Sequence, residues 1–292
     1  MAIRDCIAPD RHPRVPGITL PEGSIDTHVH VFEDRYRLSP ARGYNPPEST
    51  LDDLKHLHGQ LGLDRVVFTQ PSPYGTDNSA IIDGMVALNA QTPDRARMVV
   101  AAGADVTEEQ IDAWDRIGGR GVRLNMDNKG GMAIGFDGIP SLEAKLKPFG
   151  WHIEWLFPGK DIVDLMPMLK KIEVPQSIAH FAYQPASAGV GSDGFKALLG
   201  LVRDGNTWVK ISAANRVSET ELPPYDDVRP MAHALIQANA ERIMWGTDWP
   251  HPDRYEGNPN DADLVEALGL WVRDEAMRRK IMVDTPAAFY RF

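Results

Sequence analysis

Cysteine is almost absent from this sequence, since Cys6 is the only one among 292 residues. A single thiol excludes an internal disulfide and a zinc site made of cysteine thiolates. No apolar run approaches the ~18 residues that a membrane-spanning helix needs, and residues 1–23 lack the apolar core of a signal peptide. From these absences we expect a cytoplasmic protein with no membrane partner.

Basic residues are also in deficit. The chain has 31 Lys and Arg against 41 Asp and Glu, which gives a formal net charge of −10. This balance disfavours nonspecific attraction to nucleic acid, and we expect no such partner. It does not identify a substrate, because a basic pocket can lie within an acidic protein. Whether the chain forms a homo-oligomer is left open by the sequence.

What the sequence does contain is a regular alternation of short apolar runs and longer helical stretches, in units of about 30 residues. Eight runs are predicted strands, near residues 24–31, 65–70, 97–101, 121–125, 151–156, 176–180, 207–212 and 243–248. Alternation predicts a parallel α/β sheet, and eight repeats predict closure into a single (β/α)8 TIM barrel. We predict one catalytic domain over residues 24–292. Residues 1–23 should form an extended arm, because four prolines exclude a regular helix there.

Two of these runs carry the most informative side chains. In residues 24–31, His28 and His30 are two positions apart, so both imidazoles point to the same face of the strand. The run of residues 243–248 begins with apolar side chains and ends at Asp248. Pro250 and Pro252 follow and cannot supply strand N–H groups, so the strand should stop near Asp248. The first and eighth strands are neighbours in a closed barrel. We therefore expect Asp248, His28 and His30 to meet in one pocket.

Polar residues at the other strand ends complete the candidate site, because active sites of these barrels lie at the C-terminal ends of the strands. We predict His180, on the sixth strand, as a third catalytic imidazole. The candidates for substrate binding are Arg123, Arg216, Tyr44, Gln70, Asn125, Glu154 and His251, with Lys129 and Ser212 as further polar residues near the rim. The remaining histidines are given no role at the site; they are His12, His56, His58, His152 and His233.

With these residues in place, the sequence resembles the amidohydrolase superfamily over nearly its whole length. The resemblance is carried by His28 and His30 with Val29 between them, by His180, and by residues 246–252 (GTDWPHP). More closely, the chain resembles the branch that contains 2-pyrone-4,6-dicarboxylate lactonase, through Arg123, residues 75–78 (GTDN) and residues 150–152 (GWH). Within that branch it is most similar to D-galactarolactone isomerases, which interconvert the six- and five-membered lactones of galactaric acid.

Three positions depart from the lactonase pattern. Leu156 stands where that enzyme has a tyrosine, and Tyr183 and Lys129 stand where it has arginines. Fewer arginines argue against a planar, multiply anionic substrate and fit a more hydroxylated one. The resemblance thus implies a lactone isomerase that converts a sugar-diacid 1,5-lactone, of the D-galactaro-1,5-lactone type, to the 1,4-lactone. Such an enzyme would serve hexuronate or aldarate catabolism, including galactarate and galacturonate breakdown.

Other functions remain open at this point. One is a lactone hydrolase of the 2-pyrone-4,6-dicarboxylate or muconolactone type, either metal-free or zinc-dependent. Another is a metal-dependent decarboxylase, and a third is a non-catalytic binding protein on a barrel scaffold. Fold alone does not separate these.

The residues suggest one mechanism for both lactone reactions. Asp248 is the candidate general base, and His28, His30 and His180 are candidate donors to the lactone carbonyl oxygen. Arg123 is a candidate clamp for the substrate carboxylate, with Arg216 and Lys129 as second candidates.

The same three histidines and Asp248 also suit a mononuclear zinc site by residue type. The predicted fifth strand, however, has no lysine, and the resemblance to the lactonase branch implies a reaction without metal. We therefore predict no cofactor, with one Zn²⁺ held by His28, His30, His180 and Asp248 as the alternative.

Overall fold

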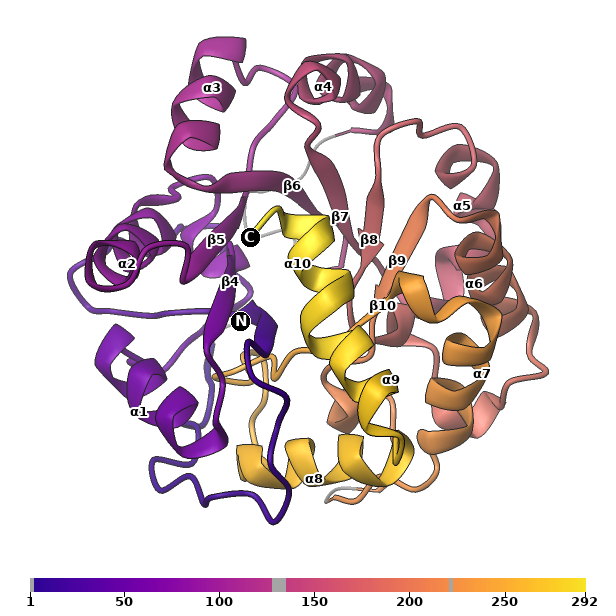
Figure 1. Ribbon diagram of the computed structural model, residues 1–292. Helices are drawn as coiled ribbons and strands as arrows, with labels where there is room; N and C mark the ends of the chain where they lie inside the picture. The colour runs from indigo at the N-terminus through magenta and orange to yellow at the C-terminus, as the bar shows by residue number, and fades with distance from the viewer. Residues whose placement is uncertain (1–2, 128–134, 221–222) are drawn as a thin grey trace.

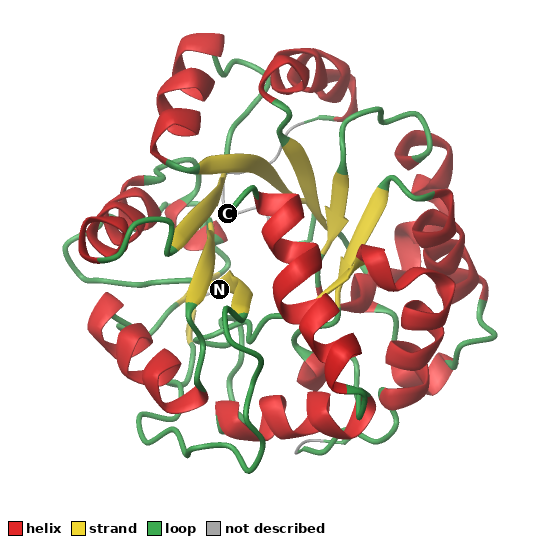
Figure 2. Cartoon of the chain, in the orientation of Figure 1, coloured by secondary structure: helices red, strands yellow, loops and turns green. Residues whose placement is uncertain are grey.

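The computed structural model describes residues 3–127, 135–220 and 223–292, so Lys129 lies outside the described residues. Within these ranges, eight parallel strands pair in the order β2-β4-β5-β6-β7-β8-β9-β10. Helices surround this ring of strands (Figures 1 and 2). The (β/α)8 barrel predicted from the sequence is therefore confirmed.

The strands lie close to their predicted positions. They are β2 (Ile25–Val29), β4 (Arg65–Thr69), β5 (Ala96–Val100), β6 (Gly119–Asn125), β7 (His152–Leu156), β8 (Gln176–Ile178), β9 (Thr207–Lys210) and β10 (Ile243–Met244). The sequence did not predict a second, two-stranded parallel sheet, in which β1 (Arg4–Asp5) pairs with β3 (Tyr44–Asn45). This pairing joins the N-terminal arm to the loop after β2.

The helices are α1 (Leu51–Leu61), α2 (Ser79–Gln91), α3 (Glu108–Ile117), α4 (Ile139–Leu146), α5 (Ile162–Leu169), α6 (Asp193–Asp204), α7 (Arg229–Asn239), α8 (Asp261–Trp271), α9 (Glu275–Arg279) and α10 (Thr285–Tyr290). Among the described residues, no helix combines the length and the apolar character that crossing a bilayer requires.

Local chemistry sets the limits of several helices. Thr50 and Asp53 form a reciprocal capping box at the start of α1, and Thr107 and Gln110 do the same for α3. Such a cap stabilises a helix by about 1 kcal/mol. Helix α1 ends at Gly62, whose φ of 76° is readily reached only by a residue without a Cβ. These signals set where α1 and α3 begin and where α1 ends.

A buried polar cluster joins the first and last strands. The Thr247 N–H and hydroxyl both donate to the Asp26 carboxylate, at 3.0 and 2.6 Å. The ladder of β10 ends at Met244, and the N–H of Thr247, three residues on, bonds to this carboxylate instead of to a neighbouring strand. Nε2 of His58 lies 3.4 Å from Oδ2 of the same carboxylate. His58 is therefore a buried structural residue.

Beyond this cluster the two chain segments stay side by side. The Asp248 N–H donates to the His28 carbonyl at 3.0 Å, and the His30 N–H donates to the Trp249 carbonyl at 2.8 Å. The eighth strand is shorter than predicted, but its continuation still runs along β2. This closure places the carboxylate of residue 248 next to the histidines of the first strand.

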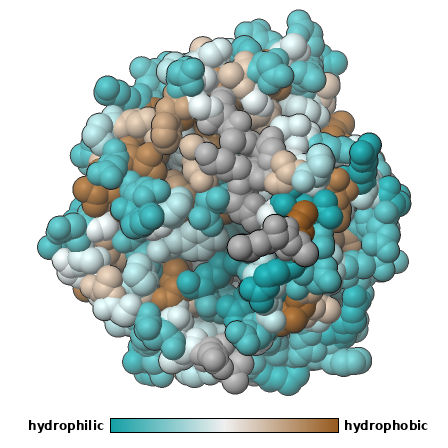
Figure 3. All heavy atoms as spheres, turned by 180° about the vertical axis from the view of Figure 1, so that it is seen from behind, coloured by the Kyte–Doolittle hydropathy of each residue, from teal (hydrophilic) through white to brown (hydrophobic). Residues whose placement is uncertain are grey.

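The C-terminal segment closes the opposite end of the barrel. Tyr290 of α10 is fully buried, and the ring of Phe289 packs against His152 with a centroid distance of 4.5 Å. The Arg120 side chain donates to the carbonyl of Tyr290 at 3.1 Å. Figure 1 shows α10 lying across the centre of the ring, and Figure 3 shows the other face, which is largely hydrophilic with scattered hydrophobic residues. His152 therefore belongs to the core at the N-terminal end of the strands.

Candidate active site

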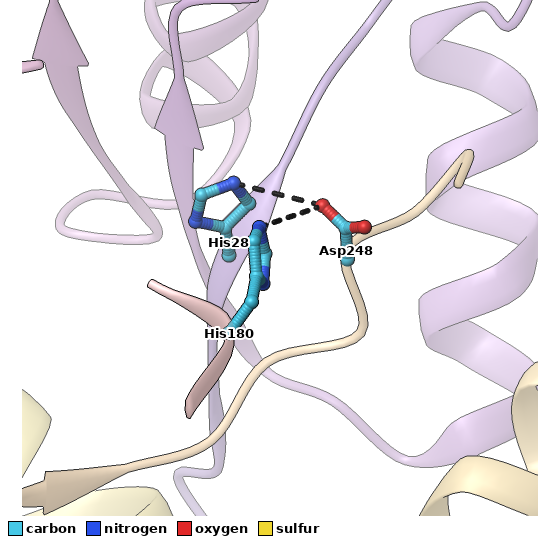
Figure 4. A group of neighbouring side chains, drawn as sticks. All are labelled: His28, His180 and Asp248. Carbon is cyan, nitrogen blue, oxygen red and sulfur yellow. Dashed lines mark ion pairs between the residues drawn. The ribbon is translucent and has the colours of Figure 1, made fainter. Parts of the chain in front are cut away.

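Three imidazoles and one carboxylate converge at the C-terminal end of the barrel. Oδ1 of Asp248 lies 3.7 Å from Nε2 of His28, 3.7 Å from Nε2 of His30 and 3.4 Å from Nε2 of His180. All four side chains are buried. Figure 4 shows the His28 and His180 nitrogens directed at the same oxygen of Asp248. The structure thus brings together the four residues that the sequence nominated as catalytic.

The backbone at Asp248 is unusual. Its φ is 67°, in the left-handed region that side chains other than glycine rarely adopt. The cost of such a conformation is of order 1–3 kcal/mol, so the surrounding structure must hold it. The N–H of Asp248 is bonded to His28, and its carbonyl accepts from the His251 N–H at 2.7 Å. This conformation turns the carboxylate toward the imidazoles.

Arg216 holds the other oxygen of the same carboxylate. Its Nε donates to Oδ2 of Asp248 at 2.9 Å, and its Nη2 donates to the carbonyl of Pro252. Burial alone would lower the pKa of Arg216. The neighbouring Asp248 carboxylate more than offsets this, so the pKa is raised overall and the guanidinium stays protonated. The sequence nominated Arg216 as a second grip on the substrate. In the structure its side chain is bonded to Asp248 and Pro252, which fixes the orientation of the Asp248 carboxylate.

The histidines are kept neutral by their surroundings. Burial is the largest cause that lowers the pKa of His28, His30 and His180 well below the usual value. Nδ1 of His30 lies 2.7 Å from the carbonyl of Thr69, which can only accept, so the proton of His30 is on Nδ1. His30 therefore presents an unprotonated Nε2 to the site. Nδ1 of His180 lies 2.9 Å from the hydroxyl of Ser212.

Beneath His28 lies an ion pair that sequence reasoning missed. Lys210, at the end of β9, contacts Oε2 of Glu154, the carbonyl of Thr27 at 2.8 Å and Nδ1 of His28 at 3.2 Å. Lys210 and Glu154 are both fully buried. Glu154 was expected to bind substrate, but it lies in the middle of β7 and therefore below the rim. The signal available in the sequence was a lysine within an otherwise apolar strand.

A polar cavity opens above the imidazoles. Four residues nominated for substrate binding line it: Tyr44, Arg123, Asn125 and Arg216. The rest of its wall is formed by His30, Ser72, Asp127, Leu156, His180, Tyr183, Asp248, Pro252 and Asp253. Ser72, Asp127 and Asp253 were not predicted, because they lie in connecting segments beyond the strand ends; Ser72 begins a short 3-10 helix. Burial raises the pKa of Asp127.

The three other residues nominated for substrate binding do not line this cavity. The side-chain amide of Gln70 donates to the carbonyls of Gly75 and Asp77, at 3.1 and 2.8 Å. Nε2 of His251 lies 3.1 Å from Asp261. Glu154 is committed to Lys210, as described above. These side chains hold loops and neighbouring groups in place, so the geometry gives them no direct contact with a substrate.

Arg123 is the cavity residue best placed to bind an anion. Its Nη1 donates to the carbonyl of Gln70 at 2.8 Å, which fixes the guanidinium. Its Nε is buried and has no hydrogen-bond partner in the described part of the chain. An unsatisfied donor on a buried guanidinium costs free energy until an acceptor binds nearby. Arg123 is therefore prepared for a substrate oxygen.

The same residues could be ligands of a divalent metal by type. Ligand atoms of His28, His180 and Asp248 lie within 4.8 Å of one another, so spacing alone admits an ion. The outer contacts of His28 and Asp248 do not fit one. A metal-bound imidazole normally gives its other N–H to an acceptor, whereas Nδ1 of His28 faces the amine of Lys210, and Asp248 already pairs with Arg216. We therefore assign no catalytic step to a metal, and its absence stays a prediction.

Comparison with known proteins agrees with this geometry. The family model described as "Amidohydrolase" matches residues 25–292. The chain belongs to the amidohydrolase family. It is 32% identical to a 4-sulfomuconolactone hydrolase of Hydrogenophaga intermedia, over 98% of this chain and 94% of that protein. It is 30% identical to a D-galactarolactone isomerase of Agrobacterium fabrum, over 94% of each.

One further relative and one solved structure are also similar to this chain. A 2-pyrone-4,6-dicarboxylate hydrolase of Comamonas testosteroni is 28% identical, over 96% of this chain and 93% of that protein. An apo crystal structure of an Agrobacterium tumefaciens protein has a TM-score of 0.85 and 28% identity, over 95% of this chain and 98% of that one. The resemblance to the lactonase branch is thereby confirmed. Family and relatives together support an enzyme that acts on lactones.

Proposed function

We propose that this amidohydrolase is a lactone isomerase. It would convert a sugar-diacid 1,5-lactone, of the D-galactaro-1,5-lactone type, to the 1,4-lactone by moving the acyl group between two hydroxyl oxygens of one molecule. The relative named a D-galactarolactone isomerase supports this assignment. The charge of the cavity wall is the observation that carries it.

Among the described residues of the cavity wall, two are permanently cationic, Arg123 and Arg216. Arg216 is already bonded to Asp248 and Pro252, so Arg123 is the cation left for a substrate carboxylate. Two carboxylic side chains, Asp127 and Asp253, also line the cavity. They would repel a second anionic group but can accept hydrogen bonds from hydroxyls. A lactone with one carboxylate and several hydroxyls fits this wall better than a dicarboxylate.

In the proposed reaction, Asp248 removes the proton from a free hydroxyl of the substrate. That oxygen attacks the lactone carbonyl carbon and forms the new ester bond, while an imidazole N–H of His28 or His180 stabilises the negative charge that develops on the carbonyl oxygen. His30 is not such a donor, because its proton is on Nδ1 and faces the Thr69 carbonyl. The bond from this carbon to the ring oxygen then breaks. The expelled alkoxide takes the proton back from Asp248, so no water is consumed and the carboxylate is regenerated.

The choice between hydroxyl and water as nucleophile depends on access. A substrate hydroxyl held against the carbonyl has a high effective molarity, on the order of 10⁵ M or more in well-oriented cases. Tyr44 and Tyr183 line the cavity, Tyr44 is buried, and burial raises the pKa of both phenols, so they remain neutral and protonated. Such walls favour the intramolecular route, because they limit the entry of water.

A lactone hydrolase is the second candidate, and the names of two relatives favour it. In that case Asp248 would deprotonate a water molecule, and the product would be the open acid. Nothing else in the site would need to change. The two reactions therefore have to be separated by the fate of the oxygen atoms.

The test uses the purified protein, a D-galactaro-1,5-lactone substrate and ¹⁸O-labelled water. The expected result is conversion to the 1,4-lactone seen by NMR, with no enzyme-dependent acid release and no ¹⁸O in the lactone product. A diacid carrying one ¹⁸O atom and formed at the rate of substrate loss would instead establish hydrolysis. The Asp248→Asn variant serves as the control for spontaneous lactone rearrangement.

A further inference from the structure

We propose that Lys210 and Glu154 are positioning residues that fix the tautomer of His28. In this arrangement the single proton of the neutral imidazole is on Nε2, where it can be donated to the reacting oxygen. The same arrangement makes His28 a poor metal ligand. Only the catalytic consequence rests on the proposed function; the tautomer itself does not.

The first step of the argument is the set of contacts around the Lys210 amine. Its Nζ lies 2.8 Å from the carbonyl of Thr27, in contact with Oε2 of Glu154, and 3.2 Å from Nδ1 of His28. An ammonium group has three N–H donors and no acceptor. The carbonyl and the carboxylate can only accept, so two of the donors are used there. The third N–H is then directed to the ring nitrogen.

The second step concerns the imidazole. A ring nitrogen that accepts a hydrogen bond carries no proton, and a neutral imidazole has one proton in total. An imidazolium would carry a second proton on Nδ1 and direct it at the Lys210 ammonium 3.2 Å away, so the buried ring is neutral. The proton is therefore on Nε2, the atom that lies 3.7 Å from Oδ1 of Asp248.

The third step is a comparison with the neighbouring histidine. His30 has its proton on Nδ1, because that atom faces the carbonyl of Thr69. The pair thus presents one donor, on His28, and one acceptor, on His30, to the same region above Asp248. A metal ion would require an unprotonated Nε2 on both rings. The difference between their two outer partners, an amine and a carbonyl, excludes this state.

The carboxylate of Glu154 provides a way to test the idea. Its Oε1 lies 3.5 Å from Nδ1 of His28, is buried and has no hydrogen-bond partner in the described part of the chain. If the Lys210 amine is removed, Nδ1 can carry the proton and donate it to Glu154. The proton would then leave Nε2. Lys210→Met should therefore invert the tautomer of His28 while retaining a linear side chain.

The decisive measurement is a long-range ¹H–¹⁵N spectrum of protein labelled at histidine, with His28 assigned by the loss of its signals in His28→Asn. The wild type should show His28 protonated at Nε2 and His30 protonated at Nδ1. Lys210→Met should move the His28 proton to Nδ1 and leave His30 unchanged. The exposed Lys147, which pairs with Glu173 at the surface, supplies the matched control Lys147→Met, which should change neither ring. A wild-type His28 protonated at Nδ1 overturns the proposal, and that reading does not require Lys210→Met to fold; it needs only the His28→Asn variant for assignment.

Zinc binding provides a second readout, by calorimetry with ZnCl₂ on the same proteins. Lys210→Met should bind one zinc ion at least tenfold more tightly than the wild type or Lys147→Met. A wild type that binds zinc stoichiometrically and as tightly as Lys210→Met contradicts the inference.

For activity on the lactone, Lys210→Met should lower kcat by about 10²–10³-fold, as for the loss of one oxyanion donor, with a smaller change in KM. If no lactone is turned over by any variant, the proposed function fails, while the tautomer of His28 is still decided by the spectrum.

Discussion

Mild acid should destabilise this protein strongly, because several histidines are buried without charge. Burial lowers the pKa of His28, His30 and His180 well below the usual value, and it lowers the pKa of His152 to about 3. In the unfolded chain the same side chains have pKa values near 6.5. A depressed folded-state pKa gives stability that is present above the unfolded value and is lost as the pH falls below it.

The magnitude follows from the number of protons. At about pH 5.5 the unfolded chain has bound nearly one proton per histidine that the folded chain has not, which costs about 1.4 kcal/mol for each. Four such histidines cost about 5–6 kcal/mol between pH 7.5 and pH 5.5. Domains of this kind are stable by only about 5–15 kcal/mol in total, so the effect should be large.

The assay is urea denaturation at pH 7.5, 6.5 and 5.5, followed by tryptophan fluorescence and far-UV circular dichroism. His152→Gln lies away from the candidate site and should reduce the loss of stability by about 1.4 kcal/mol, one quarter of the total. The matched control is His12→Gln, because His12 is exposed and should leave the pH dependence unchanged. A total loss below about 1 kcal/mol over this range would refute the reasoning that these rings are buried and neutral.

Three further predictions concern the site. Asp248→Asn should lower kcat by about 10²–10⁴-fold while the fold is retained, because the amide oxygen can still accept from Nε of Arg216. Steady-state kinetics and thermal denaturation measure the two effects. A variant that keeps more than about a tenth of the normal kcat would exclude Asp248 as the base. Arg123→Lys should raise KM about tenfold with little change in kcat, because lysine cannot offer two parallel donors to a carboxylate; an unchanged KM would count against the clamp. Prolonged dialysis against a chelator should leave activity unchanged, and one bound zinc per chain whose removal abolishes turnover would show the opposite.

The sequence was sufficient for the barrel because its signals are local and repeated. Each central strand, such as β5 or β7, is buried along its whole length, so most of its side chains are apolar and turn residues bound the run. The catalytic candidates were accessible for the same reason. His28, His30 and Asp248 stand at or just beyond strand ends, and the barrel topology alone sends such residues to one rim.

The sequence did not show how far below the rim of the barrel a strand residue lies, or which buried group it pairs with. Glu154 was taken for a rim residue, although it lies two residues before the end of β7 and pairs with Lys210 inside the barrel. Lys210 was not among the candidates and His58 was given no role at the site, because their burial depends on carboxylates more than thirty residues away in the chain. The sequence also did not show that Arg216 binds Oδ2 of Asp248, because that pairing depends on how the two side chains are placed in the fold.

The contact between β2 and the segment after β10 has a consequence for refolding kinetics. The bonds that join Asp26 to Thr247 and His28 to Asp248 span more than two hundred residues of chain, and contacts of such separation form late because loop closure must come first. Helical signal should therefore return early after dilution from denaturant. Catalytic turnover should return last, because the active site is complete only when the segment after β10 has docked against β2.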